Sequence, residues 1–152
     1  MAYTANHLRS RLFVRTVEFD PDSGDETAVT LNPEDGEDYL ALNANGAPKR
    51  YLFQIMRSVG TGGLTTAKVY AATAADGTGS TAVATITPTT ADAVGDYVSV
   101  EVDADQIRDA LAGATHVGLE IDQVTSGDEC IVVVIGAHCQ HEYDELTADY
   151  IS

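Results

Sequence analysis

Apolar residues recur at every second position in many short segments of this chain, and Gly, Pro, Asn or Asp residues separate these segments. In residues 12–19, for example, Phe13, Val17 and Phe19 share one face of an extended chain, with Arg15 between them. In residues 50–57, the alternation places Tyr51, Phe53 and Ile55 on one side. A period of two is typical of β-strands with one buried face. The pattern therefore predicts an all-β fold.

Segments of this kind suggest about nine strands, which a single β-sandwich or jelly-roll-like domain would accommodate. In the last segment, Ile131 to Ile135 are apolar at consecutive positions. Such a run predicts a central strand that is buried on both faces. The nine expected strands cover residues 12–19, 27–31, 39–42, 50–57, 64–72, 82–87, 97–102, 116–122 and 129–141.

Residues 103–112 depart from the alternation, because Ile107 and Leu111 are spaced four apart. This spacing predicts one short helix between two strands. Asp105 is the expected N-cap and Gly113 the expected C-cap, since these residue types favour those positions.

The length of 152 residues is that of one domain. We expect an N-terminal arm at residues 1–11, the β-sandwich domain at residues 12–141 and an acidic C-terminal tail at residues 142–152. The arm has no period-two core of its own, and the tail carries Tyr143 and Tyr150 among its acids. Terminal segments of this kind either fray or dock on a neighbour.

The charge of the chain is strongly acidic, with 24 Asp and Glu residues against 8 Lys and Arg and a net charge of −16. Residues 69–152 contain Arg108 as their single base, whereas Arg9, Arg11 and Arg15 lie near the start with no acid around them. Nucleic acids require clustered cations, so we expect no nucleic acid partner. Dense carboxylates keep a protein soluble at high salt, and a halophilic origin is therefore one interpretation. An ordinary acidic protein is the other.

We expect no membrane partner either, because the longest apolar stretch, residues 130–137, is too short to span a bilayer. Residues 1–11 also lack the apolar core of a signal peptide. Cys130 and Cys139 point to opposite sides of one expected strand, so free thiols are expected.

The sequence contains no catalytic motif, and we expect neither enzymatic activity nor a cofactor. The best candidates for a Ca²⁺ or Mg²⁺ site are Asp20, Asp22 and Asp25, whose spacing is similar to the opening of an EF-hand loop. Gly24 stands one position too early for that loop, and strands are expected on both sides. The interpretation is therefore that no metal centre is present.

The layout of the chain resembles the small capsid decoration, or cement, proteins of tailed viruses. The resemblance lies in the short arm, in the Thr-, Ala- and Gly-rich residues 71–84, in Gly113-Ala114-Thr115-His116-Val117-Gly118-Leu119, and in the tail Glu145-Leu146-Thr147-Ala148-Asp149. It implies a β-rich homotrimer on the capsid surface of the virion, with the major capsid protein as partner. We expect the arm and the tail to dock on that partner through Arg9, Arg11, Arg15, Tyr143 and Tyr150.

Three alternatives remain open from the sequence. A neck or tail protein of the same virion would share all these features. A carbohydrate-binding β-sandwich would need aromatic side chains for stacking, and without Trp it would rely on Tyr39, Tyr51, Tyr70 and Tyr97. A metal-dependent hydrolase would need acids from several loops to converge.

Overall fold

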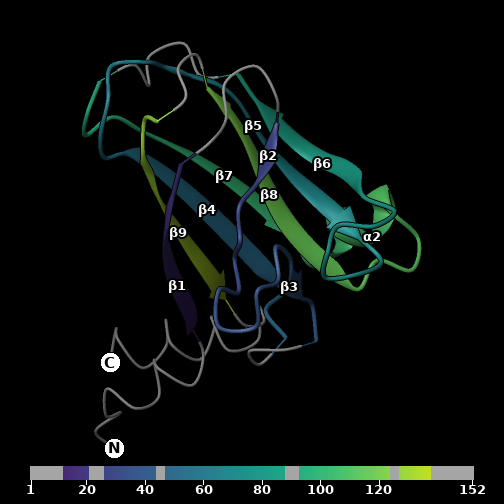
Figure 1. The fold of residues 1–152 in the computed structure, drawn as a ribbon. Helices are drawn as coiled ribbons and strands as arrows, with labels where there is room; N and C mark the ends of the chain where they lie inside the picture. Colours follow the sequence, from purple (N-terminus) through teal and green to yellow (C-terminus); the bar gives the residue numbers. More distant parts are fainter. Residues whose placement is uncertain (1–11, 21–25, 44–46, 88–92, 124–126, 138–152) are drawn as a thin grey trace, which may run out of the picture.

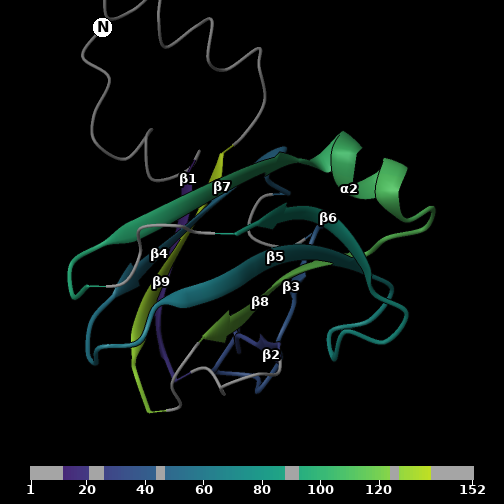
Figure 2. The same ribbon diagram turned by 90° about the horizontal axis from the view of Figure 1, so that it is seen from above.

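The computed structural model describes residues 12–20, 26–43, 47–87, 93–123 and 127–137. These residues form two β-sheets that face each other, with one short helix at an end of the sandwich (Figures 1 and 2). The predicted all-β sandwich of nine strands is therefore confirmed for the described part of the chain. No helix in that part is long and apolar enough to span a membrane.

The first sheet contains four antiparallel strands in the order β1-β9-β4-β7. Its strands are β1 (Leu12–Phe19), β4 (Arg50–Arg57), β7 (Tyr97–Asp103) and β9 (Cys130–Ala137). The predicted bounds of the first two strands are correct, because their alternation of apolar and polar residues is uninterrupted. The part of the last predicted strand that follows Ala137 lies outside the described residues.

The second sheet has the order β2-β8-β5-β6, and a further short strand, β3, also pairs with β8. Its strands are β2 (Thr27–Ala28), β3 (Leu40–Ala41), β5 (Leu64–Ala72), β6 (Thr81–Ile86) and β8 (His116–Gln123). The first two are shorter than predicted, since only two residues of each pair with β8.

The helix, α2 (Ala104–Ala110), connects β7 to the loop before β8. The predicted N-cap Asp105 is wrong, because Asp105 lies inside the first turn. Asp103 is the N-cap: its carboxylate accepts a 2.7 Å hydrogen bond from the Gln106 backbone N–H, and the Gln106 side chain accepts a 2.9 Å bond from the Asp103 N–H. This capping box satisfies two backbone donors that a helix start otherwise leaves open. The C-cap is Leu111 rather than the predicted Gly113.

The core lies between the sheets, and the longer strands each contribute one face to it. Tyr51, Phe53 and Ile55 of β4 are almost fully buried, as their alternation predicts. Opposite them, Leu119 and Ile121 of β8 are completely buried. The remaining core members include Val29, Leu31, Ala67, Val69, Val100, Val102, Ile107, Val132 and Val134.

The prediction that the last strand, β9, is buried on both faces is wrong. The strand lies between β1 and β4, as expected for a central strand, but it is not buried on both faces. Val132 and Val134 are inaccessible in the core, whereas Ile131, Val133 and Ile135 point outward and are partly exposed. A two-layer sandwich covers each sheet on one side only. The apolar residues on the other side of β9 must therefore have another explanation.

A candidate docking face and the polar sites

The outward side of the four-stranded sheet is an apolar surface, which we call the outer face. It consists of the outward positions of β1, β9, β4 and β7, which the register of the sheet places side by side. Val14, Ile135 and Leu52 form one row across three strands. The outward apolar residues are Leu12, Val14, Leu52, Met56, Tyr97, Ile131, Val133, Ile135 and Ala137, and the polar ones are Thr16, Glu18, Arg50, Gln54, Ser99, Glu101 and Asp103.

Several of these apolar side chains are well exposed to solvent. Val14 is 59% exposed, Leu12 42% and Tyr97 63%. Single exposed apolar residues are normal on protein surfaces, but contiguous patches mark interaction sites. Strands about 4.8 Å apart and a rise of about 3.3 Å per residue give this four-stranded face a footprint of roughly 500 Å².

Charged residues lie at the ends of the strands and along the β7 edge of the outer face. Arg50 and Glu101 form an exposed ion pair of 3.4 Å at one end, and Glu18 lies near the other end of β1. The two central strands differ, because the outward side of β9 is apolar, whereas that of β4 alternates Arg50 and Gln54 with Leu52 and Met56. The apolar outward strip of β9, with charged residues toward the ends and edges of the face, is similar to the apolar core and polar rim of a protein–protein interface.

The two terminal segments join the sheet at one end of the outer face. Leu12 is the register partner of Ala137, which in turn pairs with Arg50, and Figure 1 shows β1 beside β9. The chain before Leu12 and the chain after Ala137 therefore start from adjacent strands. The predicted docking residues Arg9, Arg11, Tyr143 and Tyr150 belong to these segments and lie outside the described residues.

Arg15 is the one predicted docking residue in the described part of the chain, and its side chain belongs to the inward side of β1. Its guanidinium donates hydrogen bonds to the Leu31 carbonyl, at 3.0 Å, and to the Asn32 side chain. It also lies 5.4 Å from the centre of the Phe13 ring. Arg15 therefore joins β1 to the segment after β2, and a role in partner binding remains a prediction.

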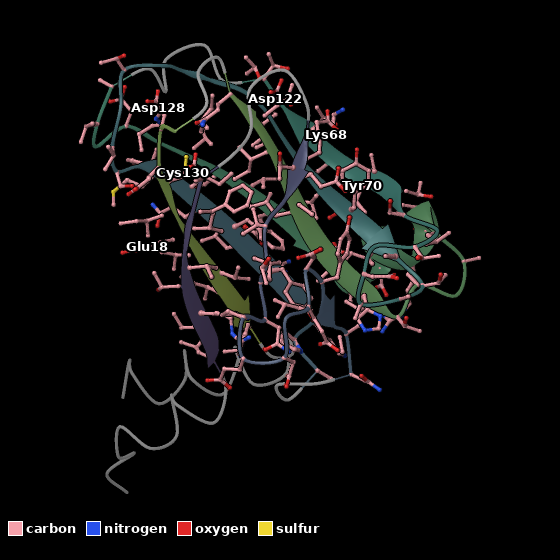
Figure 3. All side chains as sticks on the ribbon, viewed as in Figure 1. Glu18, Lys68, Tyr70, Asp122, Asp128 and Cys130 are labelled. Carbon is pink, nitrogen blue, oxygen red and sulfur yellow. The ribbon has the colours of Figure 1, made fainter. Side chains whose placement is uncertain are left out.

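The outward side of the second sheet is polar instead. Glu26 bridges the Lys68 ammonium and the Tyr70 hydroxyl, and Tyr39 donates a 2.8 Å bond to Glu120 (Figure 3 labels Lys68 and Tyr70). The bond from Lys68 lowers the pKa of Glu26, and burial together with Glu26 raises the pKa of Tyr70 to about 12. These groups satisfy one another, so the two outer sides of the sandwich differ sharply in character.

Asp20 is the one metal candidate in the described residues, and its carboxylate accepts a 3.1 Å bond from the Gly127 backbone N–H. Asp22 and Asp25 lie outside those residues. The described part of the chain contains no group of three or more His, Cys, Asp or Glu side chains that could hold a metal ion.

The sequence did not reveal a buried ion pair between Arg57, at the end of β4, and Asp128, just before β9. The Arg57 side chain is fully buried, and its guanidinium lies 2.9 Å from the Asp128 carboxylate. It also donates a 3.3 Å bond to Gln123, and Asp128 accepts a bond from the Gly62 N–H. The alternation in β4 does indicate that Arg57 is buried, because it places Arg57 on the same side of the strand as the core residues.

The pair fixes the loop between β4 and β5 against the start of β9. The Arg57 bond, followed by the bond from Gly62, lowers the pKa of Asp128. Gly60 has a φ of +101°, and a Cβ there would lie 1.8 Å from an Asp128 oxygen. Glycine is therefore required at this close approach.

Two of the tyrosines considered for sugar stacking are core residues, since Tyr39 and Tyr51 are each 1% exposed. Tyr70 is partly buried and bonded to Glu26, which leaves Tyr97 as the exposed ring among the four.

No protein family model and no curated protein matches this chain. Some solved structures are distantly similar to this chain. One belongs to the Bacillus endospore appendages, which are described as a novel family of disulfide-linked pili. It has 14% sequence identity and a TM-score of 0.42, and the match covers 84% of this chain and 88% of that chain. Another is a carbohydrate-binding module of the endoglucanase Cel5A from Eubacterium cellulosolvens, with 17% identity, a TM-score of 0.35 and coverage of 84% and 94%.

Proposed function

We propose that this chain is a non-enzymatic structural protein of a tailed virus particle, which decorates and stabilises the capsid by self-association and by docking of its terminal segments. The observation that carries the proposal is the outer face, on which Leu12, Val14 and Tyr97 are exposed and the outward apolar residues of β9 are partly exposed. Burial of apolar surface is the main driving force of protein association. A protein with such a face gains stability when it binds to its own copies or to a lattice.

The size of the outer face supports an interface that includes more than the sheet. A stable interface buries about 800 Å² on each partner, whereas the sheet offers a footprint of roughly 500 Å². Terminal segments that dock with the sheet would supply the rest. Both segments leave from the same end of the outer face, so one partner surface can engage the sheet and a segment together.

A carbohydrate-binding module has less support, because Tyr97 is the one strongly exposed tyrosine of the described residues and offers a single stacking platform. Enzymatic function also has less support than association. Among the perturbed groups of the described residues, Glu26 and Asp128 belong to ion pairs that stabilise the fold, and burial is the main cause of the raised pKa of Tyr51 and of Cys130.

Quantitative mass spectrometry of purified particles of the virus that encodes the chain tests the proposal. Decoration predicts hundreds of copies per particle and a release of the protein when capsid subunits are dissociated. Six or twelve copies would contradict decoration and indicate a neck or tail protein. Absence from the particles would overturn the virion proposal altogether.

Light scattering of the pure protein in molar salt tests self-association. We expect a trimer for the natural sequence and a monomer for Val14→Asp, which places a charge on the outer face. Val94→Asp is the matched control, since Val94 is 60% exposed but lies in the loop before β7. A monomeric natural protein, or equal behaviour of the two variants, would contradict the proposed role of the outer face.

A further inference from the structure

We infer that the outer face is covered by residues 1–11 of an adjacent copy of this chain. The inference rests on the proposed self-association and names the segment that fills the interface. Three observations carry it: the reach of the segment, the charge on the outer face and the sequence just before β1.

The reach of residues 1–11 is sufficient for the length of the outer face. An eight-residue strand such as β1 or β9 is about 26 Å long. Eleven extended residues span up to about 38 Å. Residues 138–152 are also long enough, so length alone does not choose between the two terminal segments.

The charge of the outer face distinguishes between the two terminal segments. The charged residues of the outer face are Glu18, Glu101, Asp103 and Arg50, which gives an excess of acid. Residues 1–11 carry Arg9 and Arg11 and no acid. Residues 138–152 carry four acids and neither Lys nor Arg. Complementary charge fixes the partner of an interface, and like charge rejects the wrong one. The outer face therefore accepts the N-terminal segment and repels the C-terminal one.

The sequence before β1 favours an adjacent copy over the same copy. To cover its own sheet, the chain would have to reverse direction immediately before Leu12, because β1 is itself part of that sheet. Residues 7–11 contain no Gly, Pro, Asn or Asp, and Ser10 is the one residue among them of a type that favours tight turns. A reversal at Asn6 would leave five residues to cover the face. An arm that continues onto a neighbour needs no reversal.

This arrangement explains how an odd-numbered ring can form. The arm of one copy contacts the sheet of the next, so the two contacting surfaces differ and the interface is heterologous. Such contacts close into a ring when the rotation between copies allows it. Arg9 and Arg11 supply charge pairing at the rim, and Leu8 and Tyr3 supply apolar surface for the centre.

A complementation experiment with full-length variants tests the inference. The arm variant carries Arg9→Glu and Arg11→Glu, and the face variant carries Val14→Asp. Each alone should lose the oligomer, with at least a tenfold weaker association. An equimolar mixture should form one-to-one pairs in native mass spectrometry, because the intact arm of the face variant binds the intact outer face of the arm variant. Arg108→Glu is the charge control, since Arg108 lies on α2 and should leave the oligomer unchanged.

The outcomes separate this inference from the proposed function. If the face variant dissociates and the arm variant remains a trimer, another segment or a second sheet covers the outer face, and the inference is overturned while self-association stands. If both variants dissociate but the mixture forms no pairs, the arm covers its own sheet and the inference is again wrong. A natural protein that is monomeric under all these conditions overturns both. Circular dichroism melting of each variant verifies that the sandwich is folded.

Discussion

At the scale of single residues, the interaction between Arg57 and Asp128 links the end of β4 to the segment before β9, which is distant in the sequence. The carboxylate is almost completely buried and its pKa is lowered by the guanidinium. A carboxyl whose pKa is lower in the folded than in the unfolded state binds fewer protons when folded. Its contribution to stability is therefore present above the ordinary carboxyl pKa and is lost as the pH falls through the folded value.

We therefore expect the melting temperature of the natural protein to decrease as the pH falls below about 4, and Asp128→Asn to weaken this dependence. Some dependence should remain, because the pKa of Glu26 and that of Asp76 are also lowered. At neutral pH the variant should melt lower, since a buried guanidinium loses its charge partner. Scanning calorimetry between pH 2.5 and 7 measures both effects, and an identical pH profile of the two proteins would contradict the assignment.

Cys130 is the second residue with a specific expectation. Its thiol is buried at the start of β9, and burial raises its pKa to about 11. Because the thiolate is the reactive form, the thiol should be inert in the folded protein. In a Cys139→Ser background, a thiol reagent at pH 7.5 should label Cys130 at least a hundredfold faster after denaturation than before. Rapid labelling of the folded protein would show that this end of the strand opens.

At the scale of elements, β9 offers two neighbouring valines with opposite environments. Val132→Asp places an unpaired charge in the core, at a cost that approaches the whole stability of a small domain, about 5–15 kcal/mol. Val133→Asp places the same charge on the outer face and should cost about 1 kcal/mol. Expression and chemical denaturation of the two variants test which of the two valines points into the core. Equal damage by both would show that the outer face is covered within a single copy.

The elements also show how far sequence reasoning reaches. The bounds of β1, β4 and β5 were predicted correctly, because one buried face produces an uninterrupted alternation. For β9 the run of consecutive apolar residues misled, since the sequence does not tell whether the core or a partner covers an apolar side chain. The pairing of Arg57 with Asp128 was beyond prediction, as 71 positions separate the residues and only the register of the sheets brings them together.

At the scale of the whole molecule, the excess of acid predicts a dependence on salt. The Debye length decreases from about 30 Å at 0.01 M salt to about 3 Å at 1 M. Self-repulsion among the carboxylates of residues 69–152 is then screened, so the folded state should gain stability. We expect a higher melting temperature in 2 M KCl than in 0.05 M KCl. Equal values would contradict a halophilic origin.

The pairing of Leu12 with Ala137 has a consequence for protein engineering. Directly opposed residues in an antiparallel pair have Cα atoms about 4.5–5.5 Å apart, so a peptide of two or three residues can join them. New ends can be cut in the exposed turn between β5 and β6, around Thr78 and Gly79. Such a circular permutant retains every strand pairing of both sheets. It would lack residues 1–11 and 138–152 but keep every strand of both sheets.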